Sequence, residues 1–127
     1  MSAQDTKWLV PDGWMPPKGS GAVEGHEAIC VLNIGDRDAT VTMTFYFEDR
    51  EPDVVGPLQC LARRTRHYRL DFPHELNGYE LTPETPYALV VDTDVPVTVQ
   101  HTRVDTRSPQ LALMTSTAVA AGPRSGR

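Results

Sequence analysis

The stretch that decides the fold is Ala39–Glu48, ATVTMTFYFE, in which bulky apolar side chains take every second position. One side of the extended chain would carry Val41, Met43, Phe45 and Phe47, and the other Thr42, Thr44, Tyr46 and Glu48. A period of two residues over this length predicts a β-strand with one buried face. The rest of the chain can be read outward from this strand.

Short segments of the same kind flank the stretch on both sides. Proline and glycine contribute 11 and 9 of the 127 residues, a density that opposes long helices. Further strands are predicted at residues 27–33, 58–62, 66–71, 87–93, 97–105 and 110–121. In the last segment Ala and Leu favour helix, but the Thr-Ser-Thr-Ala-Val portion favours strand, and we interpret it as a strand. The pattern predicts an all-β fold, a single-domain and largely antiparallel β-sandwich of about seven or more strands.

With 127 residues, the chain has room for one domain. This β-sandwich domain is predicted over residues 1–121, and it includes an N-terminal extended arm over residues 1–25 that Trp8 and Trp14 would pin. Residues 122–127 are small, polar and rich in Gly and Pro, so a disordered tail is predicted there.

Two segments rich in turn residues interrupt the predicted strands. Residues 49–57 contain two prolines and a glycine, which predicts a loop. Residues 72–86 contain an Asn-Gly pair and three prolines, which predicts an irregular excursion with one helical turn.

Charge and cysteine content exclude several classes of function. The chain has 12 basic and 17 acidic residues, a net charge of −5 and a pI near 5.2, so general affinity for nucleic acid is disfavoured. Only Cys30 and Cys60 are present, too few for a disulfide framework or a cysteine-based metal site. No apolar run is long enough for a membrane span or a secretory signal, and the expected location is the cytoplasm.

Residues 63–69 read RRTRHYR and place four arginines and a histidine in a chain that is acidic overall. The planar guanidinium of arginine binds carboxylate or phosphate through two parallel hydrogen bonds. One interpretation is therefore anion recognition or pairing at an interface. The other is a solvated strand edge whose charges deter aggregation and pair with acidic neighbours.

A second polar row lies in residues 99–107, VQHTRVDTR. If the strand persists, one face carries Val99, His101, Arg103, Asp105 and Arg107, and the other carries Gln100 and Thr102. Such a row could orient a ligand in a cleft. From the spacing alone, a cross-strand ladder of salt bridges is the favoured interpretation.

Signatures of catalysis are absent from the sequence. The four histidines lack metal-ligand spacing, and the chain has no GxSxG, GxxxxGK[ST] or GxGxxG motif. We expect no enzymatic activity, no catalytic residue, no metal site and no cofactor. His101 and Asp105 could form an acid/base pair only through a hydrogen bond, and residues four apart in a strand are about 13 Å apart.

Three blocks of sequence resemble a known family. They are HEAICVLNIGDRDATVTMTFYFEDREP at 26–52, VGPLQCLARRTRHYRL at 55–70 and VPVTVQHTRVDTR at 95–107. With WLVPDGWMPP near the start and LALMTST near the end, they closely resemble the sensory rhodopsin transducer family of small soluble bacterial proteins. The resemblance covers residues 8–120, and residues 70–87 match the family pattern poorly.

This resemblance implies a β-sandwich that assembles into a homotetramer and has no enzymatic activity. The founding kind of member is a cytoplasmic partner of a membrane photoreceptor, and the wider family is regarded as a module that binds small molecules, including sugars. The matching positions that the resemblance ties to ligand or partner binding are His26, Glu27, Arg63, Arg64, His67, Gln100, His101, Arg103, Asp105 and Arg107.

Our leading hypothesis is a cytoplasmic, non-enzymatic signal-relay module that binds a small polar or sugar-like ligand. Its expected partners are further copies of itself, as a tetramer, and a membrane photoreceptor or another signalling protein. The main alternative is an oligomeric scaffold for protein interactions, in which the arginine rows are subunit contacts and no ligand exists. A DNA-binding regulator that uses residues 63–69 ranks below both because of the net charge.

Overall fold

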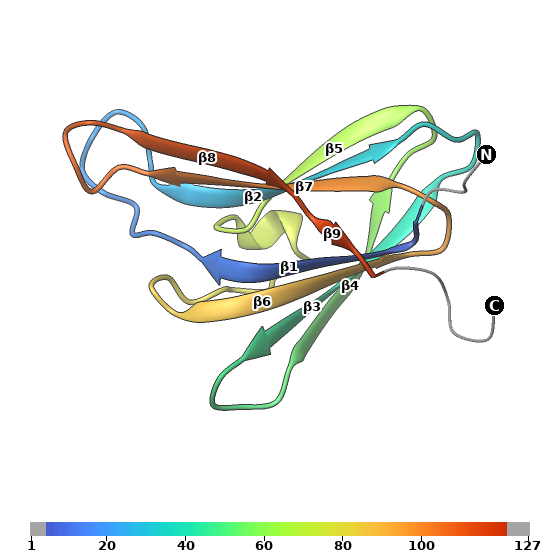
Figure 1. Ribbon diagram of the computed structural model, residues 1–127, viewed down its shortest axis with the longest axis horizontal. Coiled ribbons are helices and arrows are strands. Elements are labelled where there is room, and N and C mark those ends of the chain that lie inside the picture. The colour runs from blue at the N-terminus through green and yellow to red at the C-terminus, as the bar shows by residue number, and fades with distance from the viewer. Residues whose placement is uncertain (1–4, 122–127) are drawn as a thin grey trace.

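The computed structural model describes residues 5–121, which form two antiparallel β-sheets that pack face to face (Figure 1). One sheet has five strands in the order β4-β3-β6-β1-β9, and the other has four in the order β5-β2-β7-β8. The elements are β1 (Lys7–Trp14), β2 (His26–Asn33), β3 (Ala39–Phe47), β4 (Asp53–Cys60), β5 (Arg64–Arg69), η1 (Pro73–Glu75), β6 (Pro86–Thr93), β7 (Thr98–Asp105), β8 (Ala112–Thr117) and β9 (Val119–Ala120). The predicted all-β, antiparallel β-sandwich of seven or more strands is confirmed.

The alternating stretch forms β3, between β4 and β6 in the five-stranded sheet. Val41, Met43 and Phe45 are fully buried, whereas Thr40 and Tyr46 face the solvent. The buried face packs on the inner residues of the opposite sheet, which include Ile29 of β2. Because each such side chain stabilises the fold by roughly 1.5–3 kcal/mol when it leaves water, this apolar layer supplies most of the driving force for folding.

Two of the sequence predictions differ from the structure in their boundaries. Residues 7–14 of the expected N-terminal arm are β1, which lies inside the sheet between β6 and β9. The loop predicted over residues 49–57 is wrong in its second half, because β4 begins at Asp53. A strand tolerates Pro57 there because β4 is an edge strand, whose outer side needs no N–H donor.

Other predicted segments are confirmed. The helical turn expected within residues 72–86 is η1. The C-terminal segment is extended, as predicted, and contains β8 and β9. The expected tail at 122–127 and the first four residues of the arm lie outside the described residues.

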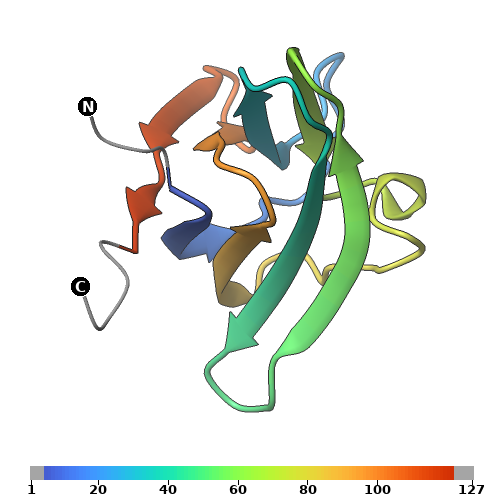
Figure 2. The same ribbon diagram turned by 90° about the vertical axis from the view of Figure 1, so that its right-hand side faces the viewer.

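The strands β8 and β9 form one continuous run that crosses from the four-stranded sheet to the five-stranded sheet (Figures 1 and 2). β8 pairs with β7, and β9 pairs with residues 8 and 9 of β1. Every residue of β8 is exposed, so neither face of this edge strand is covered by the rest of the described chain. The run closes one side of the sandwich and leaves hollows on both faces of β8.

Candidate functional site

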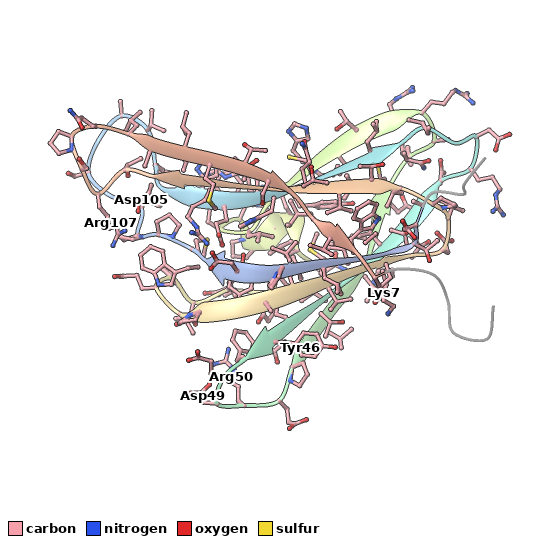
Figure 3. The ribbon with its side chains drawn as sticks, in the orientation of Figure 1. Lys7, Tyr46, Asp49, Arg50, Asp105 and Arg107 are labelled. Carbon is pink, nitrogen blue, oxygen red and sulfur yellow. The ribbon has the colours of Figure 1, made fainter. Side chains whose placement is uncertain are left out.

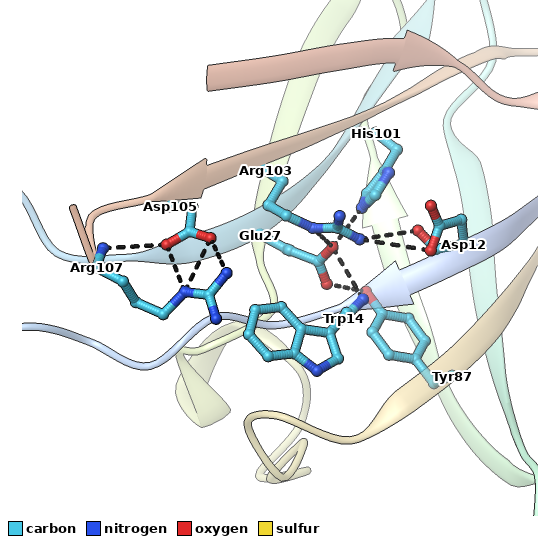
Figure 4. A network of polar contacts seen from close by, with 8 residues as sticks. All are labelled: Asp12, Trp14, Glu27, Tyr87, His101, Arg103, Asp105 and Arg107. Carbon is cyan, nitrogen blue, oxygen red and sulfur yellow. Dashed lines mark hydrogen bonds and ion pairs between the residues drawn. The ribbon is translucent and has the colours of Figure 1, made fainter. Parts of the chain in front are cut away.

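Two neighbouring strands bring three polar side chains together between the sheets. Glu27 of β2 lies directly opposite Arg103 of β7, and His101 lies opposite Ile29. Because residues two apart in a strand share a face, all three polar side chains point inward (Figure 4). Glu27 is fully buried, His101 is 2% exposed and the Arg103 side chain is 17% exposed. We call Glu27, Tyr87, His101 and Arg103 the buried cluster.

The Glu27 carboxylate accepts four hydrogen bonds. The Tyr87 hydroxyl donates to Oε1 over 2.5 Å. Oε2 lies 2.8 Å from His101 Nε2, 3.0 Å from Arg103 Nε and 3.2 Å from the backbone nitrogen of Trp14. A carboxylate offers about four acceptor sites, so Glu27 is saturated by the protein itself.

The surroundings of Glu27 favour its charged form. Burial alone would raise the pKa of Glu27, but the hydrogen bonds from His101 and Tyr87, the charge of His101 and the Trp14 N–H together lower it below its ordinary value. Burial and the neighbouring Glu27 carboxylate raise the pKa of Tyr87 well above its ordinary value, so Tyr87 remains a hydrogen-bond donor. Glu27 is therefore an ionised acceptor at neutral pH.

The lowered pKa of Glu27 predicts a loss of stability in acid. The unfolded chain takes up the Glu27 proton near pH 4.5, whereas the folded chain resists it, so this stabilisation is complete above pH 4.5 and disappears as the pH falls through the lower folded pKa. Urea unfolding at a series of pH values should show this decline. Tyr87→Phe removes one donor to the carboxylate and should move the decline to higher pH, and an unchanged acid profile would contradict the assignment.

The buried cluster also joins the two sheets. Arg103 Nη2 donates to the backbone carbonyl of Asp12 on β1 over 3.0 Å and lies 3.9 Å from the Asp12 carboxylate. Tyr87 belongs to β6 of the same sheet as β1, whereas Glu27 and Arg103 belong to the other sheet. With its acceptors filled and its carboxylate inaccessible, the buried cluster is suited to fixing the position of the sheets rather than to exchanging protons with a bound molecule.

Asp105 and Arg107 lie at the end of β7 and pair with each other. Arg107 Nη2 is 2.6 Å from Asp105 Oδ2, and the Arg107 guanidinium lies over the Trp14 ring (Figures 3 and 4). The hydrogen bonds from Arg107 lower the pKa of Asp105. Asp105 therefore makes its charge-assisted hydrogen bonds with Arg107, and His101 makes its own with Glu27.

The remaining predicted site residues lie apart from the buried cluster. Arg63 and Arg64 are exposed at the start of the edge strand β5, where Arg64 donates to the Arg63 carbonyl. His26 begins β2 and hydrogen-bonds the Glu24 carbonyl at 2.8 Å. The structure thus brings Glu27, His101 and Arg103 together, and it does not bring Arg63, Arg64 or His26 to them.

His67 and Gln100 face outward, on the other side of the four-stranded sheet. There they border an open groove of about 580 Å³, which we call the outer groove; its lining residues are Cys30, Val31, Leu32, Thr65, His67, Thr98, Gln100, Thr102, Thr115 and Thr117. Thr102 and Thr115 share a hydrogen bond of 3.3 Å. Within residues 5–121, the side chains of Thr65, His67, Thr98, Gln100 and Thr117 make no hydrogen bond, so their polar atoms are available to a ligand.

A smaller hollow of about 250 Å³ lies on the inner side of β8. We call it the side pocket; its lining residues are Leu9, Val10, Pro11, Asp12, His101, Met114, Ser116, Thr117, Ala118 and Val119. His101 is the only member of the buried cluster among them.

Reasoning from the sequence missed several residues of these sites. Tyr87 and Asp12 come from strands that are distant in sequence, and no motif marks them. The threonines of the outer groove do carry a signal, since the Thr-Ser-Thr of β8 and the threonines of β7 recur at the period of a strand face.

The described residues contain neither a metal cluster nor a membrane-spanning helix. Within residues 5–121, no group of three His, Cys, Asp or Glu side chains could hold a metal ion. Over the same residues, no helix has the length and apolar character to cross a bilayer.

The two antiparallel sheets define a small β-sandwich domain, and its polar cluster is saturated by contacts within the domain. The chain belongs to the family described as Anabaena sensory rhodopsin transducer, which matches residues 3–120 and confirms the resemblance seen in the sequence. This is a family of transducer domains rather than of enzymes.

Two solved structures are similar to the chain. The crystal structure of Thermotoga maritima 1070 has a TM-score of 0.81 and 31% identity, over 94% of this chain and 97% of that one. The Anabaena sensory rhodopsin transducer has a TM-score of 0.67 and 41% identity, over 84% of this chain and 94% of that one. No curated protein matches the chain.

Proposed function

We propose that this chain is a non-enzymatic, cytoplasmic signal-relay module that binds a small polar, sugar-like ligand in the outer groove. It would act as a homotetramer and dock on a signalling protein such as a membrane photoreceptor. Support for the signalling role comes from membership of the transducer family. Support for the ligand comes from the chemistry of the outer groove.

The observation that carries the proposal is a large open hollow at which five polar side chains have no hydrogen-bond partner within residues 5–121; they are Thr65, His67, Thr98, Gln100 and Thr117. Its volume of about 580 Å³ lies in the range of small-molecule sites, roughly 300–1,000 Å³. Hydroxyl groups donate and accept, Gln100 adds an amide and His67 adds an imidazole. A polyhydroxylated ligand, which also donates and accepts around its ring, matches this lining.

The strand β7 provides a route from the outer groove to the interior. Gln100 and Thr102 face the outer groove, while His101 and Arg103, which alternate with them, belong to the buried cluster that joins the sheets. If β7 can take two positions, a ligand that binds one of them more tightly increases the fraction of molecules in that position. Such a ligand relays a signal only by the difference in its affinity for the two states.

Calorimetric titration with monosaccharides, disaccharides, nucleosides and organic acids tests the proposal. We expect a sugar or a related polyol to bind, and Gln100→Ala to weaken this binding about tenfold, because a site built to hydrogen-bond a ligand loses roughly 1–3 kcal/mol with one partner. Thr40→Ala, an exposed threonine on the other sheet, is the matched control and should bind as the wild type does. If no compound of the panel bound, the proposal of a ligand site in the outer groove would be overturned.

A second candidate, an oligomeric scaffold without a ligand, is favoured by one observation. Exposed apolar side chains gather around β8 and β9, and they are Leu111, Leu113, Met114 and Val119. An edge strand with such side chains is suited to contact with another protein. Sedimentation separates the two candidates: if His67→Ala and Gln100→Ala dissociate the assembly, the outer groove is a subunit contact, and if the assembly persists while ligand binding is lost, it is a ligand site.

A further inference from the structure

The side pocket is a second hollow, distinct from the outer groove, and its lining is mostly apolar. Its walls come from β1 and β9 on one side and from β7 and β8 on the other. Leu9, Pro11, Met114 and Val119 supply apolar surface. A volume of about 250 Å³ equals roughly eight waters at their share of liquid volume, enough for a small organic molecule.

One ring nitrogen at the side pocket has no hydrogen-bond partner within residues 5–121. His101 is 2% exposed, and its Nε2 is engaged with Glu27. Its other ring nitrogen, Nδ1, makes no hydrogen bond within residues 5–121. Every side-chain nitrogen or oxygen that is fully buried in the described chain has a partner, so Nδ1 must reach a solvent-accessible space, and His101 lines the side pocket.

The hydrogen bond to Glu27 decides which ring nitrogen of His101 is left for the side pocket. An ionised carboxylate only accepts, so His101 Nε2 must carry the proton that it shares with Glu27. Nδ1 is therefore the ring nitrogen left to meet a molecule in the side pocket.

The second polar group is the Asp12 carboxylate at the mouth of the side pocket. Its side chain is 88% exposed, and its nearest cation is the Arg103 guanidinium, 3.9 Å away. Figure 4 shows Asp12 and His101 on the same side of that guanidinium. A carboxylate at the mouth of an apolar hollow disfavours an anion and favours a cation that donates hydrogen bonds.

We propose that the side pocket binds a primary ammonium group carried on a short apolar chain, with Asp12 and His101 Nδ1 as acceptors and Leu9, Met114 and Val119 around the chain. The net charge of −5 adds a general attraction for cations. The inference does not rest on the proposed sugar ligand, because the two hollows lie on opposite faces of β8.

Nuclear magnetic resonance of the full chain tests this inference, with n-pentylamine as the probe and 1-pentanol as its uncharged match. The Met114 methyl and the His101 ring nitrogens should shift on addition of the amine, while the methyls of Met15 and Met43, which are buried elsewhere in the core, should not. We expect the amine to bind about tenfold more tightly than the alcohol, because hydrogen bonds to charged groups are the stronger ones. The side-chain amide of Gln100 reports the outer groove separately.

Asp12→Asn removes the charge at the mouth and should weaken amine binding about tenfold. Asp49→Asn, at the tip of the β3–β4 hairpin, is the matched control (Figure 3) and should leave amine binding unchanged. Equal affinity for amine and alcohol, shifts that avoid Met114 and His101, or an unaffected Asp12→Asn variant would each overturn the inference.

A parallel titration with Nα-acetyl-lysine amide distinguishes the two sources of this ammonium group. Tighter binding than n-pentylamine indicates the lysine of a partner protein, and weaker binding indicates a free amine.

Discussion

Replacing Glu27 with alanine is expected to lower the free energy of unfolding by about 3–5 kcal/mol. The variant loses the acceptor that Tyr87, His101 and Arg103 share, and it leaves these side chains inside the sandwich without a carboxylate. Removing one member of a buried charged network costs more than the network contributes as a whole, because the abandoned groups stay away from water. At this size such a loss lowers the melting temperature by roughly 10–20 °C.

Urea unfolding at neutral pH, with Asp92→Ala as the control, measures this effect. Asp92 is also an acidic strand residue paired with a cation, Lys7 at 2.7 Å, but both side chains are substantially exposed. An exposed ion pair contributes about 0–1 kcal/mol, so the control should stay close to the wild type. If Glu27→Ala lost no more stability than Asp92→Ala, the buried cluster would not hold the sheets together.

The second large effect is expected from Gly13→Ala, which should destabilise the fold by about 2–3 kcal/mol. Gly13 lies opposite Tyr87 in the β1–β6 pair, and a Cβ atom at this position would come within 2.3 Å of the Tyr87 ring. The ring is buried and packs against Phe45, with their centroids 5.6 Å apart. A methyl group therefore has to displace the ring and pull its hydroxyl away from Glu27.

Gly21→Ala provides the matched control, because a Cβ atom there would have no heavy atom within 4 Å. It should change the unfolding free energy by no more than about 0.5 kcal/mol, as surface substitutions usually do. The Tyr87 ring resonances should move in Gly13→Ala and remain in place in Gly21→Ala. Equal stability of the two variants would show that the sandwich can accommodate a side chain between β1 and β6.

The sequence predicted the strands well wherever alternation was strong, because one buried face leaves a direct mark on the residue pattern. β3 is the clearest case, and β7 has Val99 and, as Figure 4 shows, His101 and Arg103 on its predicted inner face. The start of β4 was missed because Gly56 and Pro57 are local signals for a turn, while its pairing with β3 is a tertiary effect. β1 was expected as an arm for the same reason, since only its partners β6 and β9 make it a strand within the sheet.

The candidate site could be predicted only in part. Arg103 and His101 stood out as polar residues in a strand, but their partner Glu27 was included only through the family resemblance, and Tyr87 was not identified. These contacts join residues up to 76 positions apart, and no local spacing encodes them. The separation of His67 and Gln100 from His101 follows from strand alternation. That the inner face of the four-stranded sheet is closed and its outer face is open depends on how the two sheets pack.

The alternation of β7 has a consequence for how this gene can vary. Val99, His101 and Arg103 point to the interior, and Gln100 and Thr102, which alternate with them, line the outer groove. Deleting or inserting a single codon within this strand would exchange the two sets, exposing the imidazole and guanidinium and forcing an amide and a hydroxyl into the apolar layer. Insertions and deletions should therefore be tolerated in the turn between β7 and β8. Within β7 itself, substitutions can be accepted, but a one-residue change in length cannot.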